Sequence, residues 1–166
     1  MYLPSQRRMI CAMTVQLSGR LARPDRRSPG DFCPIDRAMQ VVGTRSAMLI
    51  MREAAYGTTR FDDFATRVGI TDAIAASRLR ELVDAGLLER RPYREEGQRT
   101  RQEYVLTESG HDLIPALVAL GAWGRKHATR RGTPTVTHEG CGATVDVVMH
   151  CAEGHAVEED QLLVTG

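Results

Sequence analysis

The feature that most constrains the fold is a five-residue turn, residues 67–71, between two stretches of helical periodicity. The stretches span about 61–67 and 72–85, and each repeats apolar residues at the spacing of an amphipathic helix. Gly69 lies in the turn, and Thr71 is a favourable N-cap for the second helix. Two helices joined this closely, with glycine in the turn, have the local pattern of a helix-turn-helix.

A β-hairpin is predicted after the second helix, because extended segments at about 87–93 and 102–106 flank a polar, charged loop. Two helices are expected before the turn, at about 34–43 and 46–56. One long helix, about 107–130, is expected after the hairpin. This order predicts an α+β fold of the winged helix-turn-helix class, with a long C-terminal dimerisation helix and a small β-rich, zinc-ribbon-like tail.

The distribution of charge divides the chain into three parts. Residues 1–32 hold six arginines and two aspartates without regular periodicity, and they are expected to be a flexible basic N-terminal arm. Residues 33–131 are expected to be the winged-helix DNA-binding domain. Residues 132–166 hold six acidic residues and no lysine or arginine, which predicts an acidic, β-rich tail. No apolar run approaches the roughly 18 residues of a membrane helix, so a cytoplasmic protein without a membrane partner is expected.

The helix at 72–85 is expected to enter the major groove of double-stranded DNA by its N-terminal half. Its core-facing residues are expected to be Ile74, Leu79, Leu82 and Val83. The residues expected to contact DNA are Thr71, Asp72, Ala73, Ala76, Ser77, Arg78 and Arg80. Small side chains allow close approach to base edges, while serine and arginine can bond phosphate or guanine. The alternative is an ordinary surface helix with a solvated face.

Arginines crowd the predicted hairpin and favour a second DNA contact. The hairpin residues expected to reach DNA are Arg90, Arg91, Arg94 and Arg99, and Arg101 lies beside them. Such a basic tip suits the phosphate backbone or the adjacent minor groove. Glu89, Glu95 and Glu96 dilute the charge, so a solvated hairpin is the alternative.

Residues 33–127 resemble the HxlR-type winged-helix regulators, which are relatives of the MarR group. The matching stretches are Cys33-Pro34-Ile35-Asp36-Arg37-Ala38, Ser77-Arg78-Leu79-Arg80-Glu81-Leu82, Asp84-Ala85-Gly86-Leu87, Glu103-Tyr104-Val105-Leu106-Thr107-Glu108-Ser109-Gly110 and Ala122-Trp123-Gly124. The resemblance implies a homodimeric DNA-binding regulator, either a repressor or an activator. One departure is the entry to the second helix, Gly43-Thr44-Arg45-Ser46, where the family usually has a Gly-Gly-Lys-Trp-like sequence.

The last predicted helix carries a broad apolar stripe, Leu113, Leu117, Leu120 and Trp123, widened by Val118, Ala119 and Ala122. Part of this surface is expected to pair with a symmetry mate, together with the helix at 33–42, so that two recognition helices lie about 34 Å apart. The resemblance also makes Cys33 a candidate redox sensor, since some members sense oxidants through the cysteine at this position. A partly buried cysteine without a signalling role is the alternative.

The tail contains His138-x2-Cys141 and Cys151-x3-His155, two pairs of soft ligands that resemble a small zinc ribbon. A usual ribbon has two Cys-x2-Cys pairs, and His150 is a rival ligand. A degenerate ribbon without metal is the alternative, so we assign no metal ligand and no cofactor.

An enzyme is the competing class of function. The sequence contains no P-loop, no dinucleotide-binding glycine fingerprint and no nucleophile elbow, so no catalytic residue is assigned. A third possibility is a metal- or redox-sensing adaptor that keeps the winged fold without reading DNA. The expected partners are thus double-stranded DNA and a second copy of the chain, with an unknown effector.

Overall fold

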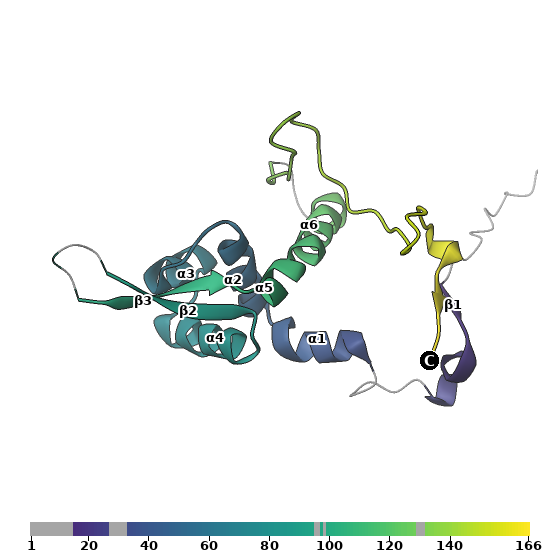
Figure 1. The fold of residues 1–166 in the computed structure, drawn as a ribbon, viewed down its shortest axis with the longest axis horizontal. Helices are drawn as coiled ribbons and strands as arrows, with labels where there is room; N and C mark the ends of the chain where they lie inside the picture. The colour runs from purple at the N-terminus through teal and green to yellow at the C-terminus, as the bar shows by residue number, and fades with distance from the viewer. Residues whose placement is uncertain (1–14, 27–32, 95–96, 98, 129–131) are drawn as a thin grey trace, which may run out of the picture. The chain divides into compact units, whose positions relative to one another are not determined.

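The computed structural model describes residues 15–26, 33–94, 97, 99–128 and 132–166 (Figure 1). These residues belong to two compact units, of which one is Pro29–Val147 and the other combines Met1–Ser28 with Val148–Gly166. The first unit holds the predicted helices and hairpin. The second unit holds short elements from both ends of the sequence.

The larger unit contains its helices and strands in the predicted order. The helices are α1 (Pro34–Val42), α2 (Arg45–Ala55), α3 (Phe61–Val68), α4 (Asp72–Asp84), α5 (Glu108–Asp112) and α6 (Ile114–His127). Strands β2 (Leu88–Tyr93) and β3 (Arg101–Leu106) pair antiparallel, from Leu88 opposite Leu106 to Tyr93 opposite Arg101. This hairpin, the wing, projects away from the helices (Figure 1). The predicted α+β arrangement is confirmed.

The core lies where α2, α3 and α4 meet the base of the wing. Ile50 and Met51 of α2 and Phe64 of α3 have no exposed surface, and Leu79 of α4 has none either. Leu88 at the start of β2 is 1% exposed. Burying a side chain of this size stabilises a fold by about 1.5–3 kcal/mol. These contacts hold the helix-turn-helix and the base of the wing in one body.

Three threonines cap the helices of the larger unit at their N-termini. Each side-chain oxygen accepts a hydrogen bond from the backbone N–H three residues later. The pairs are Thr44 with Ala47 at 3.2 Å, Thr71 with Ile74 at 3.4 Å and Thr107 with Gly110 at 3.1 Å. Such a cap typically contributes about 1 kcal/mol, because it satisfies a backbone donor that the helix cannot. The beginnings of α2, α4 and α5 are therefore set by sequence.

The prediction of one long helix over 107–130 is wrong, because the chain forms α5 and α6 with a break at Leu113. Pro115 explains the break: it has no N–H to donate to the carbonyl of His111, and its ring clashes with a helical carbonyl at that position. Proline is tolerated in the first turn of a new helix, which is where α6 places it.

α6 has 14 residues, and no helix in the described part of the chain is long and apolar enough to cross a membrane.

The start of α5 lies directly against the start of the wing. A Cβ atom on Gly110 would lie 2.2 Å from the carbonyl oxygen of Leu87, so only glycine fits there. The Thr107 hydroxyl donates to the Gly86 carbonyl at 2.6 Å, and the Thr107 N–H donates to the Leu87 carbonyl at 3.2 Å. Backbone thus packs on backbone where α4, β2 and α5 converge.

The tail has less regular structure than its composition predicts. The tail was expected to be β-rich, but the described residues 132–147 form one isolated bridge, Thr137 with Thr144. In the smaller unit, His150 bridges to Ala156, and β4 (Leu163–Val164) pairs in parallel with β1 (Gln16–Leu17). The remaining elements there are the short 3-10 helices η1 (Gly19–Ala22), η2 (Pro24–Arg26) and η3 (Glu159–Gln161).

Candidate nucleic-acid interface

The turn between α3 and α4 depends on Gly69, which ends α3 in the left-handed conformation with φ +69°. The N–H groups of Gly69 and Ile70 both donate to the Ala65 carbonyl, at 3.0 and 3.1 Å. These bonds satisfy a carbonyl that the end of α3 would otherwise leave without a partner. Thr71 then caps α4, which begins at Asp72, so only three residues separate the two helices.

The face that α4 buries differs in one respect from the sequence prediction. Leu79 and Leu82 are buried as predicted, but the N-terminal turn is anchored by Ala75, which is 0% exposed. Ile74 was expected to face the core and is instead 44% exposed. One position along a helix turns a side chain by about 100°, so a core face centred on positions 75, 79 and 82 leaves residue 74 outside.

The side chains predicted to contact DNA lie on the accessible part of α4. Thr71, Asp72, Ala73 and Arg80 are exposed, whereas Ala76, Ser77 and Arg78 are half-buried. The Ser77 hydroxyl donates to a Glu81 carboxylate oxygen at 2.9 Å, and Arg78 forms an ion pair with the same carboxylate. Glu81 therefore binds two of the side chains that were predicted to contact DNA, Ser77 and Arg78. Exposed Ile74 is a surface residue that the sequence argument missed, although a helical wheel centred on Ala75 would have found it.

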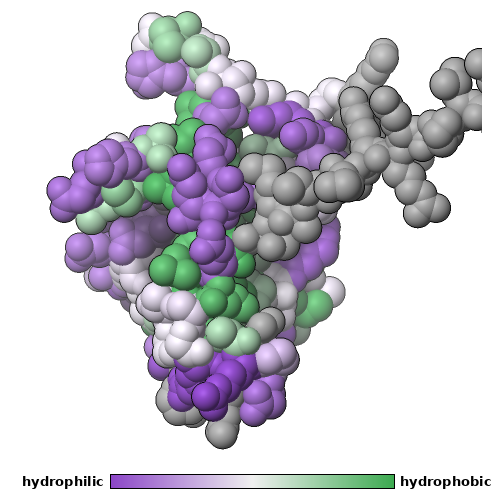
Figure 2. All heavy atoms as spheres, turned by 90° about the vertical axis from the view of Figure 1, so that its right-hand side faces the viewer, coloured by the Kyte–Doolittle hydropathy of each residue, from purple (hydrophilic) through white to green (hydrophobic). Residues whose placement is uncertain are grey.

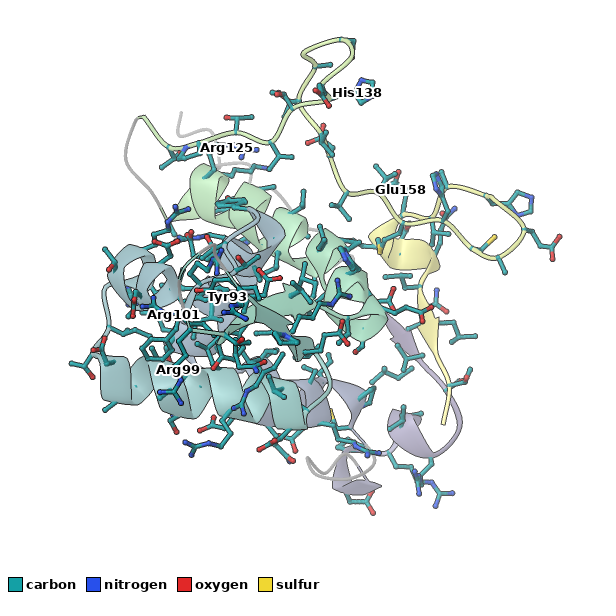
Figure 3. The ribbon with its side chains drawn as sticks, turned by 60° about the vertical axis from the view of Figure 1, so that its left-hand side comes forward. Tyr93, Arg99, Arg101, Arg125, His138 and Glu158 are labelled. Atoms are coloured by element: carbon teal, nitrogen blue, oxygen red, sulfur yellow. The ribbon has the colours of Figure 1, made fainter. Side chains whose placement is uncertain are left out.

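The wing presents its arginines to solvent. Arg90, Arg91, Arg94, Arg99 and Arg101 are all exposed. Figure 3, which brings the wing toward the viewer, labels Tyr93, Arg99 and Arg101, whose side chains project from this region. Arg91 bonds Glu89 with its Nη2 at 2.6 Å and its Nε at 2.7 Å, so part of the positive charge is neutralised within the wing.

Aromatic contacts fix the wing to the helices. The Arg60 guanidinium lies 3.2 Å from the centroid of the Tyr93 ring, and Arg90 lies 5.8 Å from the Tyr104 centroid. Tyr104 in turn meets Phe64 edge to face, with ring centroids 6.3 Å apart. Arg60 and Tyr93 are 33 positions apart in the sequence, so no local pattern could have predicted their contact.

Two apolar surfaces of the larger unit remain exposed. Leu113, at the break before α6, and Leu117 of α6 pack against the unit's own core, whereas Leu120 and Trp123 of α6 are 52% and 59% exposed. On α1, Ile35 is 72% exposed and Met39 is 49% exposed. Figure 2 shows hydrophobic residues reaching the surface in an interrupted band among hydrophilic ones. The predicted apolar stripe is therefore divided. Leu113 and Leu117 face the core, whereas Leu120 and Trp123 are exposed to solvent.

The cysteines and histidines form local pairs. Cys33 is half-buried and caps α1, its sulfur accepting from the Asp36 N–H at 3.4 Å. His138 Nδ1 lies 3.3 Å from Cys141 Sγ in one hairpin, and Cys151 Sγ lies 3.4 Å from His155 Nδ1 in another. No group of three or more histidine, cysteine or acidic side chains placed to hold a metal ion occurs among the residues with described positions.

Comparisons with known proteins agree with this architecture. The model of the HxlR-like helix-turn-helix family matches residues 41–132. An uncharacterised HTH-type transcriptional regulator of Mycobacterium bovis is 40% identical over 124 residues, which cover 72% of this chain and 77% of that protein. One from Methanothermobacter thermautotrophicus is 33% identical over 101 residues, 60% of this chain and 76% of the relative.

Solved structures give the same result. The crystal structure of PA1607, described as a candidate transcription factor, is 31% identical with a TM-score of 0.72, and the match covers 81% of this chain and 94% of that one. The redox regulator HypR in its reduced form is 27% identical with a TM-score of 0.51, over 57% of this chain and 92% of its own. With a family model spanning the helix-turn-helix, the wing and α6, the chain belongs to the HxlR-like helix-turn-helix family.

Proposed function

We propose that the protein is a sequence-specific DNA-binding transcription regulator that acts as a homodimer in the cytoplasm. The observation that carries the proposal is the pairing, within one unit, of an exposed N-terminal half of α4 with an arginine-bearing wing. In winged-helix proteins the second helix of the motif reads base edges, while flanking basic groups position it by contacting phosphates. The names of the relatives, which are HTH-type transcriptional regulators, support the same function.

The base-reading residues of this proposal lie in the first two turns of α4. Thr71, Asp72, Ala73, Ala76 and Ser77 supply small or hydrogen-bonding groups at the exposed end of the helix. Arg78 and Arg80 follow on the same helix and can bond phosphate or guanine. Ser77 and Arg78 are held by Glu81 in the free protein, so binding would exchange those contacts for DNA contacts.

The wing supplies the sequence-independent part of the affinity. Arg90, Arg91, Arg94 and Arg99 would each neutralise a phosphate or enter the minor groove beside the α4 site. Each neutralised phosphate releases counterions, so the logarithm of the binding constant falls with the logarithm of salt concentration by roughly 0.9 per contact. Binding that depends on these arginines is therefore expected to weaken steeply with salt.

The dimer would use the apolar surfaces of α1 and α6. Leu120 and Trp123 on α6 and Ile35 and Met39 on α1 are large apolar side chains that a monomer leaves in water. Isologous pairing through a two-fold axis would bury them against the same surface of a second copy. Two α4 helices would then meet successive major grooves on a near-palindromic site, about 34 Å apart.

Two finer features are part of the proposal. Cys33 would respond to oxidants, which the likeness to the redox regulator HypR supports. The hairpins of the tail would fold as a zinc-ribbon-like module, which the Cys and His spacing in the sequence supports. Alkylation kinetics of Cys33, and the zinc content of the purified chain, test these two features separately.

The main test is fluorescence anisotropy with duplex fragments from the region upstream of the protein's own gene, at several salt concentrations. We expect a saturable, sequence-dependent signal, which Arg80→Ala and Arg91→Ala weaken by tenfold or more. Lys126→Ala removes an exposed cation at the end of α6 and is the matched control, expected to bind like wild type. Equal DNA binding by wild type and all three variants would show that the DNA-binding surface lies elsewhere on the protein. If wild type binds no fragment, the alternative of a winged-fold adaptor that does not bind DNA would be supported.

A further inference from the structure

A cavity of about 690 Å³ opens within the larger unit, beside α2 and α6. Three elements form its walls: Met48 and Leu49 from α2, Leu117 and Ala122 from α6, and Val136 and Val145 from the hairpin that follows α6. The walls are almost entirely apolar. Its size lies within the range of about 300–1,000 Å³ that is typical of small-molecule sites.

We propose that this cavity is the effector site of the regulator and takes an uncharged, apolar small molecule. This inference rests on the proposed function, because an effector is meaningful only for a protein that regulates. It adds the position of the site and the chemical class of the ligand.

The shape of the cavity favours a small molecule over a second copy of the chain. A dimer contact needs a continuous surface, whereas here the apolar side chains line a hollow with walls from three elements. Of the four exposed side chains that the proposed dimer buries, Trp123, Ile35 and Met39 do not line the cavity, whereas Leu120 does. A molecule of about the cavity's volume would remove apolar surface from water on three sides.

The charges at the rim indicate that the ligand is neutral. Arg52 lines the cavity, but its guanidinium already bonds the buried Glu53, with Nε to Oε1 at 3.0 Å, and lies 5.9 Å from the Tyr56 ring centroid. Arg125 on α6 (Figure 3), the other cation of the lining, also has an interaction partner. Burying an unpaired charge is costly, so a ligand without a charge fits this site best.

A chain of contacts joins the cavity to the DNA-reading motif. Glu53, which holds Arg52, also accepts from the Thr58 hydroxyl at 3.4 Å. Thr58 accepts in turn from Arg67 Nη1 at 3.2 Å, and Arg67 lies in the last turn of α3, two residues before Gly69. α2 therefore meets the cavity with one face and the helix-turn-helix with the other. A ligand that shifts α2 would shift α3 and α4, because a packed core does not deform independently.

The first experiment titrates the full chain with N-phenyl-1-naphthylamine, an uncharged apolar fluorophore. We expect saturable, blue-shifted fluorescence with one site per chain and a dissociation constant in the micromolar range. Ala122→Phe and Val136→Trp fill the cavity from two different walls and are expected to weaken binding at least tenfold. Ala116→Phe adds the same bulk as Ala122→Phe at an exposed α6 position outside the cavity, and it is expected to bind like wild type.

Circular dichroism and thermal melting confirm that each variant is folded before it is compared. Equal binding by wild type and both cavity-filling variants, or no saturable binding by wild type, would overturn the proposed site. The second experiment measures DNA affinity with and without saturating fluorophore. We expect at least a fivefold change for wild type and none for Ala122→Phe.

The two experiments separate the two proposals. If the fluorophore occupies the cavity but leaves DNA affinity unchanged, the effector role is wrong. If wild type binds no DNA even without fluorophore, the proposed function fails, and the fluorescence titration still decides whether the cavity is a ligand site.

Discussion

The guanidinium carbon of Arg60 lies 3.2 Å from the centroid of the Tyr93 ring, which joins the beginning of α3 to the outer end of β2. Arg60 is the N-cap residue of α3 and makes no side-chain cap hydrogen bond there. Its side chain packs on Tyr93 of the wing instead. The stack limits how far the wing can swing relative to the helix-turn-helix.

Loss of this stack should loosen the wing. Tyr93→Leu keeps apolar bulk but removes the ring face, and we expect it to lower the free energy of unfolding by about 1 kcal/mol, the usual size of a cation–π contact. Urea denaturation gives this value. DNA affinity should fall with unchanged base preference, because α4 is intact. Arg60→Lys retains the charge and should restore part of the affinity lost in Arg60→Ala; no difference between these two variants would contradict a role for the stack.

Gly69→Ala should destabilise the protein through the backbone alone. Residue 69 has φ +69°, and no atom lies within 4 Å of the Cβ that alanine would add, so the cost is that of the left-handed conformation, roughly 1–2 kcal/mol. Gly124→Ala is the matched control, since Gly124 lies inside α6, also with open space around its Cβ. There alanine should stabilise by about 1 kcal/mol, because glycine is a poor helix former. Thermal denaturation of both variants should give shifts of opposite sign.

Neutralising Glu89 should strengthen DNA binding. Glu89 pairs with Arg91 in the wing, so Glu89→Gln would release the arginine and remove a negative charge that repels phosphate. We expect a several-fold gain in affinity at low salt that disappears at high salt, because the effect is electrostatic. Glu139→Gln makes the same charge change in an exposed hairpin away from α4 and the wing. Equal gains from both substitutions would indicate a general effect of net charge.

Charges on the exposed apolar surfaces of α1 and α6 should separate the proposed dimer. Ile35→Glu and Trp123→Glu each place a carboxylate where the interface would exclude water, at positions that are 72% and 59% exposed in the single chain. The fold should survive, because neither residue belongs to the core cluster. Sedimentation equilibrium should show a dimeric wild type and monomeric variants. A monomeric wild type, or variants that remain dimeric, would rule out this interface.

The sequence predicted elements whose determinants are local. Apolar spacing placed α2, α3 and α4, Gly69 marked the turn after α3, and Thr71 marked the start of α4. The arginine-rich hairpin was equally visible, because turn residues separate its two strands. The break at Leu113 was also encoded locally, in Pro115, but the prediction of one long helix rested on the apolar stripe and did not consider the proline.

Contacts between distant residues were beyond the sequence argument. Nothing near Arg60 indicates that its partner is Tyr93. The contacts of Ser77 and Arg78 with Glu81, by contrast, join residues three and four positions apart on one helix, and the sequence argument did not consider them. Ile74 was assigned to the core because it is apolar, yet the small Ala75 fills that place. The three-walled cavity arises from packing of α2, α6 and a later hairpin, and no single segment shows it.

The contact of Gly110 with the Leu87 carbonyl has a mechanical consequence. No side chain separates α5 from the base of β2 there, and Thr107 is hydrogen-bonded to the carbonyls of both Gly86 and Leu87. The junction therefore has no intervening side chains whose movement could accommodate a change in the angle between α5 and β2. A rotation of α5 would therefore move the base of β2 with it, and it would change the positions of the arginines on the wing.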